Sequence, residues 1–137
     1  MLRSRQTQIG YRSGVVSVEM ALTVPLLFLV LIGCIEFARL NMLRNSLENA
    51  CYKGARAGSI PGRTAQDAIN RAAQELQLVG VRNSKIDVMP GTITDATPEI
   101  TVTISLPLND NAWVSPHFLK DRSLIRSCTL TREKITP

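Results

Sequence analysis

The chain has 137 residues and a mass of 15.1 kDa, which is enough for one compact domain and too little for two. Its net charge of +5 is spread along the chain and is not interleaved with aromatic residues, so we expect no specific binding of nucleic acid. Apolar residues are concentrated: Met20 to Ile35 contains no charged residue, and no second run approaches the ~20 residues needed to cross a bilayer. This distribution excludes a plain soluble globule and a membrane protein with several spans.

The first fourteen residues are polar and basic, with Arg3, Arg5 and Arg12 and no acidic residue. A basic segment before an apolar run is typical of export signals, and three interpretations compete: a cleaved secretory signal, a lipoprotein signal and a retained anchor. No good small-x-small cleavage site follows the run. The sequence Leu31-Ile32-Gly33-Cys34 has the spacing of a lipobox, in which Cys34 would become the lipidated first residue.

Three features of the apolar run favour a retained anchor. Glu19 lies inside the longer apolar segment VVSVEMALTVPLLFLVLIGCIEF, where an ionised carboxylate costs up to about 3 kcal/mol at mid-bilayer, so this residue is a functional candidate. Pro25 is tolerated in a membrane-embedded helix. The helical pattern also continues beyond Cys34, because apolar and small residues keep recurring at spacings of three and four. We therefore predict one helix from Val15 to about Ala57, ended by the Gly- and Pro-rich residues 58–62.

A second helix is predicted to start at Thr64, with Asp67 as the partner in an imperfect capping box, and to end at Gly80. Its apolar positions recur at helical spacing and are rich in alanine: Ala65, Ala68, Ile69, Ala72, Ala73, Leu76 and Val79. Because alanine allows close approach, we expect this stripe to pack on the first helix or on a sheet.

Alternating apolar and polar residues predict strands in the rest of the chain. The pattern covers residues 85–89 and 100–106, and the turn-rich segment between them indicates an antiparallel hairpin. A third strand from Leu124 to Arg132 would place Leu124, Cys128 and Leu130 on one face.

The intervening residues 107–122 are expected to form an ordered loop that places Trp113 and Phe118 on the core. The predicted fold class is therefore α+β. A long N-terminal transmembrane and amphipathic helix is followed by a small head of one helix and an antiparallel sheet of about three strands.

The segment from Gly14 to Glu19 resembles the prepilin peptidase site of the type IV pilin superfamily: a basic leader ends in Gly, an apolar helix begins at the next residue, and Glu is its fifth residue. The longer segment GVVSVEMALTVPLLFLVLIGCIEFARL resembles the TadE-like family of minor pilins or pseudopilins of the tight-adherence (Flp) pilus. The matching positions are Gly14, Val18, Glu19, Ala21, Leu22, Pro25, Leu26, Leu27 and Ile35-Glu36-Phe37, and Gly54-Ala55-Arg56 matches a further motif of that family.

The resemblance implies a pilin-like layout: a cleaved leader (1–14), a transmembrane and spine helix (15–58) and a periplasmic head (59–137). It also implies a single-pass protein of the bacterial inner membrane, with a cytoplasmic N-terminus and a head in the periplasm or in a cell-surface pilus. The implied partners are a prepilin peptidase, the inner-membrane assembly platform, other minor and major pilins, and membrane lipid. The implied role is in assembling, initiating or decorating the pilus.

Charge balance gives the same site a chemical rationale. A cut between Gly14 and Val15 would create a positive amine at a helix start, and Glu19 would lie about one turn away, where it can neutralise that amine or a neighbouring subunit's amine. The alternative is that Glu19 only extends toward the membrane surface.

No enzymatic reaction is expected. His117 has no acid or Cys at ligand spacing, and the sequence contains no phosphate loop or nucleophile motif, so we expect neither a cofactor nor a metal. Cys34 is interpreted as a small apolar filler within the span. Cys51 and Cys128 would either form a disulfide in the periplasm or remain buried as free thiols. A membrane-anchored module whose head binds a ligand is the alternative function outside the pilin class.

Overall fold

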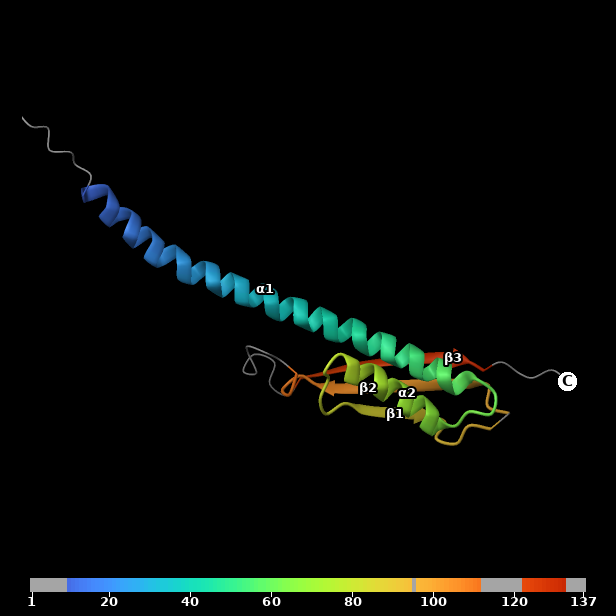
Figure 1. Ribbon diagram of the computed structural model, residues 1–137. Coiled ribbons are helices and arrows are strands. Elements are labelled where there is room, and N and C mark those ends of the chain that lie inside the picture. The colour runs from blue at the N-terminus through green and yellow to red at the C-terminus, as the bar shows by residue number, and fades with distance from the viewer. Residues whose placement is uncertain (1–9, 95, 112–121, 133–137) are drawn as a thin grey trace, which may run out of the picture. The chain divides into compact units, whose positions relative to one another are not determined.

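The computed structural model describes residues 10–94, 96–111 and 122–132. The chain divides into two compact units, Met1–Ile35 and Glu36–Pro137. The elements are α1 (Gly10–Ser59), α2 (Ala65–Leu78), β1 (Lys85–Met89), β2 (Glu99–Pro107) and β3 (Ser123–Thr131), as Figure 1 shows. The predicted α+β class and the predicted order of elements are confirmed.

Helix α1 has 50 residues and is longer at both ends than the predicted helix from Val15 to Ala57. Its first turn covers residues 10–14, so the predicted start at Val15 is about one turn too late. Propagation is the physical reason, because each residue added to an existing helix gains one hydrogen bond while fixing only one residue. At the other end, Gly58 does not stop the helix, because it is buried against α2: an added Cβ would lie 3.2 Å from the Ala68 Cβ.

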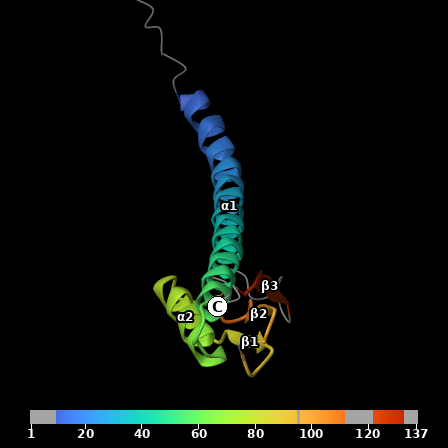
Figure 2. The same cartoon turned by 90° about the vertical axis from the view of Figure 1, so that its right-hand side faces the viewer.

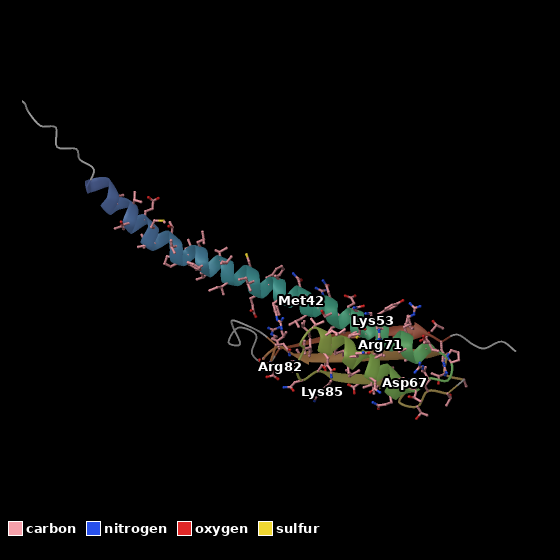
Figure 3. All side chains as sticks on the ribbon, viewed as in Figure 1. Met42, Lys53, Asp67, Arg71, Arg82 and Lys85 are labelled. Atoms are coloured by element: carbon pink, nitrogen blue, oxygen red, sulfur yellow. The ribbon has the colours of Figure 1, made fainter. Side chains whose placement is uncertain are left out.

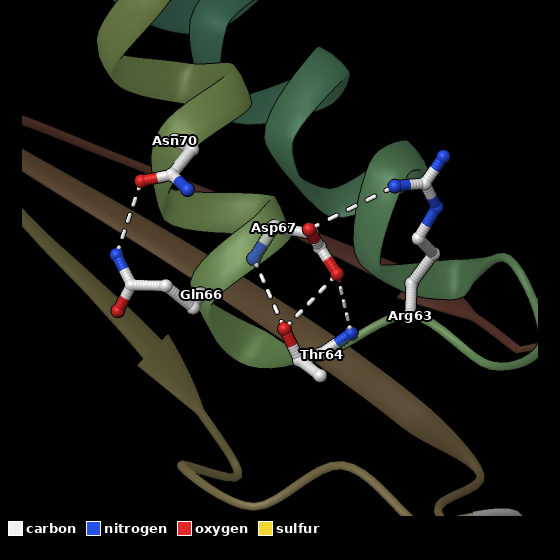
Figure 4. A network of polar contacts seen from close by, with 5 residues as sticks. All are labelled: Arg63, Thr64, Gln66, Asp67 and Asn70. Atoms are coloured by element: carbon white, nitrogen blue, oxygen red, sulfur yellow. Dashed lines mark hydrogen bonds and ion pairs between the residues drawn. The ribbon is translucent and has the colours of Figure 1, made fainter.

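Helix α2 begins with a complete capping box, which Figure 4 shows. The Thr64 hydroxyl accepts a hydrogen bond from the Asp67 N–H at 3.3 Å, and the Thr64 N–H donates to the Asp67 carboxylate at 2.9 Å. These two bonds satisfy backbone donors that a helix start otherwise leaves unpaired. The helix ends at Leu78, slightly before the predicted Gly80, which adopts φ +70° in the turn that follows.

The sheet has the order β1-β2-β3, and both neighbouring pairs are antiparallel. Val102 of β2 lies opposite Val88 of β1 and opposite Cys128 of β3, which fixes the register of all three strands. Strand β2 begins with the exposed Glu99 and then alternates between buried and half-buried residues to its end. The predicted hairpin and the predicted third strand are confirmed, with boundaries that differ from the predicted ones by at most one residue.

The core lies between one face of the sheet and the two helices α1 and α2 (Figures 1 and 2). Its buried members are Leu43, Leu47, Ala50, Cys51 and Ala55 of α1, Ala68, Ala72 and Leu76 of α2, and Ile100, Val102, Ile104 and Leu106 of β2. The helices approach closely at Gly54, where an added Cβ would lie 3.0 Å from the Ala72 Cβ and 3.1 Å from the Ala68 carbonyl oxygen. The alanine-rich stripe therefore packs on both α1 and the sheet, as its composition predicts.

A buried amide holds the connection after β2 in place. The Asn111 side chain donates to the carbonyl oxygens of Arg82 and Pro107 at 2.9 and 3.0 Å, and it accepts from the Arg82 N–H at 2.9 Å. It is only 3% exposed, so these bonds replace water entirely at this position. The predicted positions of Trp113 and Phe118 on the core lie outside the described residues.

Candidate functional site

The N-terminal unit presents an almost purely apolar helical surface. Within residues 14–35 every side chain is exposed, including Val15, Leu22, Leu26 and Phe28. The helix is long and apolar enough to cross a membrane. Apolar side chains exposed all round a helix cannot be stabilised by water, so this helix makes the chain a membrane-anchored protein.

The predicted processing residues lie on consecutive turns of this helix. Gly14 and Val15 are exposed, and Glu19 lies one turn after Val15 with an exposed side chain. The Glu19 carbonyl oxygen accepts a second hydrogen bond, from the Thr23 hydroxyl at 2.9 Å. A Cβ added at Gly14 would meet no other atom within 4 Å, so packing within the chain gives no reason for glycine at this position.

The three cysteines are free thiols in different environments. Cys34 is exposed on the apolar helix, whereas Cys51 is buried in the core and Cys128 is half-buried on β3. Cys51 and Cys128 line the same hollow of about 450 Å³ between α1 and β3, together with Tyr52 and Arg126. The structure therefore brings the two candidate disulfide partners to one hollow but does not join them.

Burial suppresses ionisation of the Cys51 thiol. Desolvation is the main cause that raises its pKa to about 11, and the Cys128 and Glu48 side chains act in the same direction. The Cys51 Sγ donates to the Arg126 carbonyl oxygen at 3.2 Å. A protonated, buried thiol is a poor nucleophile, so Cys51 is a core residue at neutral pH.

The Gly54-Ala55-Arg56 motif divides into two parts in the structure. Gly54 and Ala55 are buried, and Gly54 allows the close approach of α2. Arg56 is exposed on the opposite side of α1, in the last turn of the helix. Packing therefore accounts for the glycine and the alanine, whereas the arginine points to the surface.

A basic surface between α1 and α2 was missed by the reasoning from sequence. It combines Lys53 and Arg56 of α1 with Arg71 of α2, and Figure 3 shows Lys53 and Arg71 on neighbouring helices. The available signal was the spacing of Tyr52 and Arg56, which places both side chains on one stripe of α1, with Ile60 four residues later, just after the helix end. Within the described ranges, no cluster of three or more His, Cys, Asp or Glu side chains could hold a metal ion.

Comparison with known protein families gives a match to the TadE-like protein family over residues 14–56. No curated protein and no solved structure matches the chain. The match covers the apolar helix with Glu19 and extends through Gly54-Ala55-Arg56, so the resemblance inferred from those residues is confirmed. Residues 14–56 are therefore a TadE-like segment, which associates this membrane-anchored chain with the pilin-like proteins of the Tad pilus.

Proposed function

We propose that the chain is a minor pilin or pseudopilin that is cut between Gly14 and Val15 by a prepilin peptidase and then takes part in assembling a Tad-type pilus. The observation that carries the proposal is the family match, which begins at Gly14, the residue before the expected cut. The apolar surface begins at the next residue and surrounds the helix. The prepilin peptidase, the inner-membrane assembly platform and the other pilins are the partners that this role requires.

The proposed cut places two opposite charges one helical turn apart. The new amine of Val15 would add a positive charge to the positive end of the α1 dipole, where an unbalanced cation is unfavourable. Glu19, at the i+4 position, supplies the counter-charge within its own chain or to a neighbouring chain. A helix end that is neutral in this way suits side-by-side packing of many apolar helices in a fibre.

Two other functions compete with the pilin role: a lipoprotein and a ligand-binding module. In a lipoprotein attached at Cys34, the chain would begin in the middle of α1, yet α1 continues through Cys34 without interruption. A ligand-binding module would use its head, and the hollow beside Cys51 and Cys128 would be its site. The TadE-like match favours the pilin role over both.

The proposed orientation has the N-terminus in the cytoplasm and the head in the periplasm. Arg3, Arg5 and Arg12 precede the apolar helix, whereas Arg39 and Arg44 follow it, so the positive-inside rule gives a small bias in this direction. A reporter that is active only in the cytoplasm, fused after the last residue, is expected to be silent. Activity of that fusion, with silence of a periplasmic reporter, would contradict the orientation and the pilin role.

The N-terminal residue of the native protein tests the proposed cut. Intact mass should show a chain that begins at Val15, and Gly14→Leu should retain the leader because a peptidase that closely approaches the backbone tolerates little side chain there. Gly33→Leu is the matched control: an added Cβ at either glycine meets no other atom of the chain within 4 Å, so neither change disturbs the fold. A chain that begins at Met1, or a lipidated chain that begins at Cys34, would refute the proposal.

Replacement of the proposed counter-charge tests the role of Glu19. Glu19→Ala should be inserted and cut normally, because loss of a charge favours residence in the membrane, but it should not enter pili. Glu48→Ala removes an exposed carboxylate from the same helix beyond the apolar segment and should leave pilus number unchanged. Normal piliation of Glu19→Ala would mean that Glu19 only reaches toward the membrane surface.

A further inference from the structure

Two adjoining hollows form one groove on the surface where α1 meets α2. The first hollow, of about 390 Å³, and the second, of about 250 Å³, share Ala57, Ile60 and Arg71 among their lining residues. We refer to them together as the α1–α2 groove. Its residues come from Glu36–Pro137 alone, so its shape belongs to a single compact unit.

The floor of the α1–α2 groove is apolar. Tyr52 and Ile60 are 45% and 50% exposed, and Ala57 lies between them in the first hollow. Tyrosine is one of the residues that protein interfaces prefer, because it offers a large contact area with little loss of side-chain freedom. The floor can therefore bury apolar side chains of another molecule.

The rim of the groove carries an excess of positive charge. Lys53, Arg56, Arg63 and Arg71 line it, and the two carboxylates beside them are already engaged. Glu75 bridges two cations, with Lys53 at 2.7 Å and Arg71 at 3.0 Å. Asp67 faces Arg63 at 3.7 Å and caps α2 (Figure 4). Because one carboxylate neutralises two of these cations, the rim attracts a further anionic group.

Arg56 is the cation that the fold uses least. No carboxylate among the described residues forms an ion pair with it, and its neighbours four residues away are Tyr52 on α1 and Ile60 just after the helix end. Its positive charge lies in the last turn of α1, where it interacts favourably with the helix dipole, as any cation there would. Its guanidinium is therefore available to bind an anionic group at the surface, between the two apolar side chains of the floor.

We propose that the α1–α2 groove is the docking site for an amphipathic, acidic segment of a partner protein. Apolar side chains of that segment would cover Tyr52 and Ile60, and its carboxylates would pair with Arg56 and with the cations on either side of it. A protein segment fits better than a lone phosphate or a lipid headgroup, because the cations come from α1, α2 and the turn between them and adjoin the exposed apolar side chains of Tyr52 and Ile60. The proposal stands whether or not the chain is cut after Gly14.

Two designed helical peptides test the charge and the apolar floor together. The full chain is held in phosphatidylcholine nanodiscs, and peptide binding is followed by fluorescence anisotropy with an uncharged dye. One peptide carries leucine on one face and glutamate on the other, and the second has glutamine in place of every glutamate. The glutamate peptide should bind roughly tenfold more tightly at about 50 mM NaCl, and this advantage should shrink as salt is raised.

Matched variants assign the binding to the groove. Arg56→Gln should weaken binding of the glutamate peptide roughly two- to fivefold, and Arg56→Lys should restore most of it. Arg44→Gln removes the same charge from an exposed position of α1 outside the groove and should leave binding unchanged. Ile60→Ser should weaken binding of both peptides, because it removes part of the apolar floor.

Three results would overturn the proposal. The first is equal binding of the two peptides. The second is an equal effect of Arg56→Gln and Arg44→Gln, which would mean that net charge alone attracts the peptide. The third is Arg56-dependent capture of phosphatidylglycerol vesicles by nanodiscs that do not bind either peptide, which would assign the groove to lipid.

Discussion

Gly54→Ala should destabilise the head, although the same change normally stabilises a helix. In an exposed helix interior, alanine is favoured over glycine by about 1 kcal/mol. At Gly54 the added Cβ would lie 3.0 Å from the Ala72 Cβ and 3.1 Å from the Ala68 carbonyl oxygen, both tighter than ordinary carbon contacts of about 3.4–4 Å. Neither neighbour is the end of a flexible side chain, so α1 and α2 must move apart.

The expected size of the effect follows from these two opposing contributions. Overpacking of a close-packed core costs about 1–3 kcal/mol, and the helix preference returns about 1 kcal/mol. The free energy of unfolding should therefore fall by up to about 2 kcal/mol, a large share of the stability of a small domain. Gly91→Ala is the control inside the same unit, because its added Cβ meets no atom within 4 Å, and it should change stability by less than about 0.5 kcal/mol.

Thiol labelling in a urea titration measures this stability in the full chain in detergent micelles. Cys51 is 1% exposed in the core, so it reacts only when the head unfolds, and mass spectrometry of its peptide separates its signal from the exposed Cys34. The double variant Gly54→Ala, Ala72→Gly should lose less stability than the sum of its single changes, because the closest contact is absent. A stabilisation by Gly54→Ala would refute the close-packing argument.

Three other changes have defined outcomes. The raised pKa of Cys51, about 11 against 9.0, favours the folded state while the thiol is protonated. This contribution, on the order of 3 kcal/mol at most, is complete below pH 9 and is lost between pH 9 and 11, so Cys51→Ala should flatten this part of a stability–pH profile. Thr64→Ala should lower the free energy of unfolding by about 0.5–2 kcal/mol, because it removes the cap of α2. The same cap lowers the pKa of Asp67 below 3.8, so acid should destabilise the parent more than the variant as pH falls below about 4, as parallel urea titrations would show. Asn111→Ala leaves the backbone N–H and C=O of Arg82 without their buried partner and should lower the free energy of unfolding by about 1–3 kcal/mol. The same labelling of Cys51 measures this change, and an unchanged urea midpoint would show that water replaces the amide.

Local patterns were sufficient for most of the secondary structure. The capping pair Thr64 and Asp67 are three residues apart, and the alternation in residues 100–106 repeats every second residue, so both signals act within a few residues. The apolar run with Glu19 likewise indicated a membrane helix and a family before any tertiary contact was known. Boundaries were less well predicted, because a helix can propagate past the point where the apolar pattern begins, as α1 does from Gly10.

Other features depend on residues that only the folded chain brings together. Gly58 has the chemistry of a helix stop, yet it continues α1 because it packs against Ala68. Sequence could not determine whether Cys51 and Cys128 are neighbours. The charge at the α1–α2 groove depends on the ion pair of Lys53 and Glu75, which are separated along the chain by a turn and most of a second helix. The sequence by itself determined the apolar helix, the TadE-like character of residues 14–56 and the order of elements, since these follow from composition and short spacings. The tertiary structure decided which glycines are packed, which cations remain exposed and where the hollows lie, because close packing joins residues that are distant along the chain.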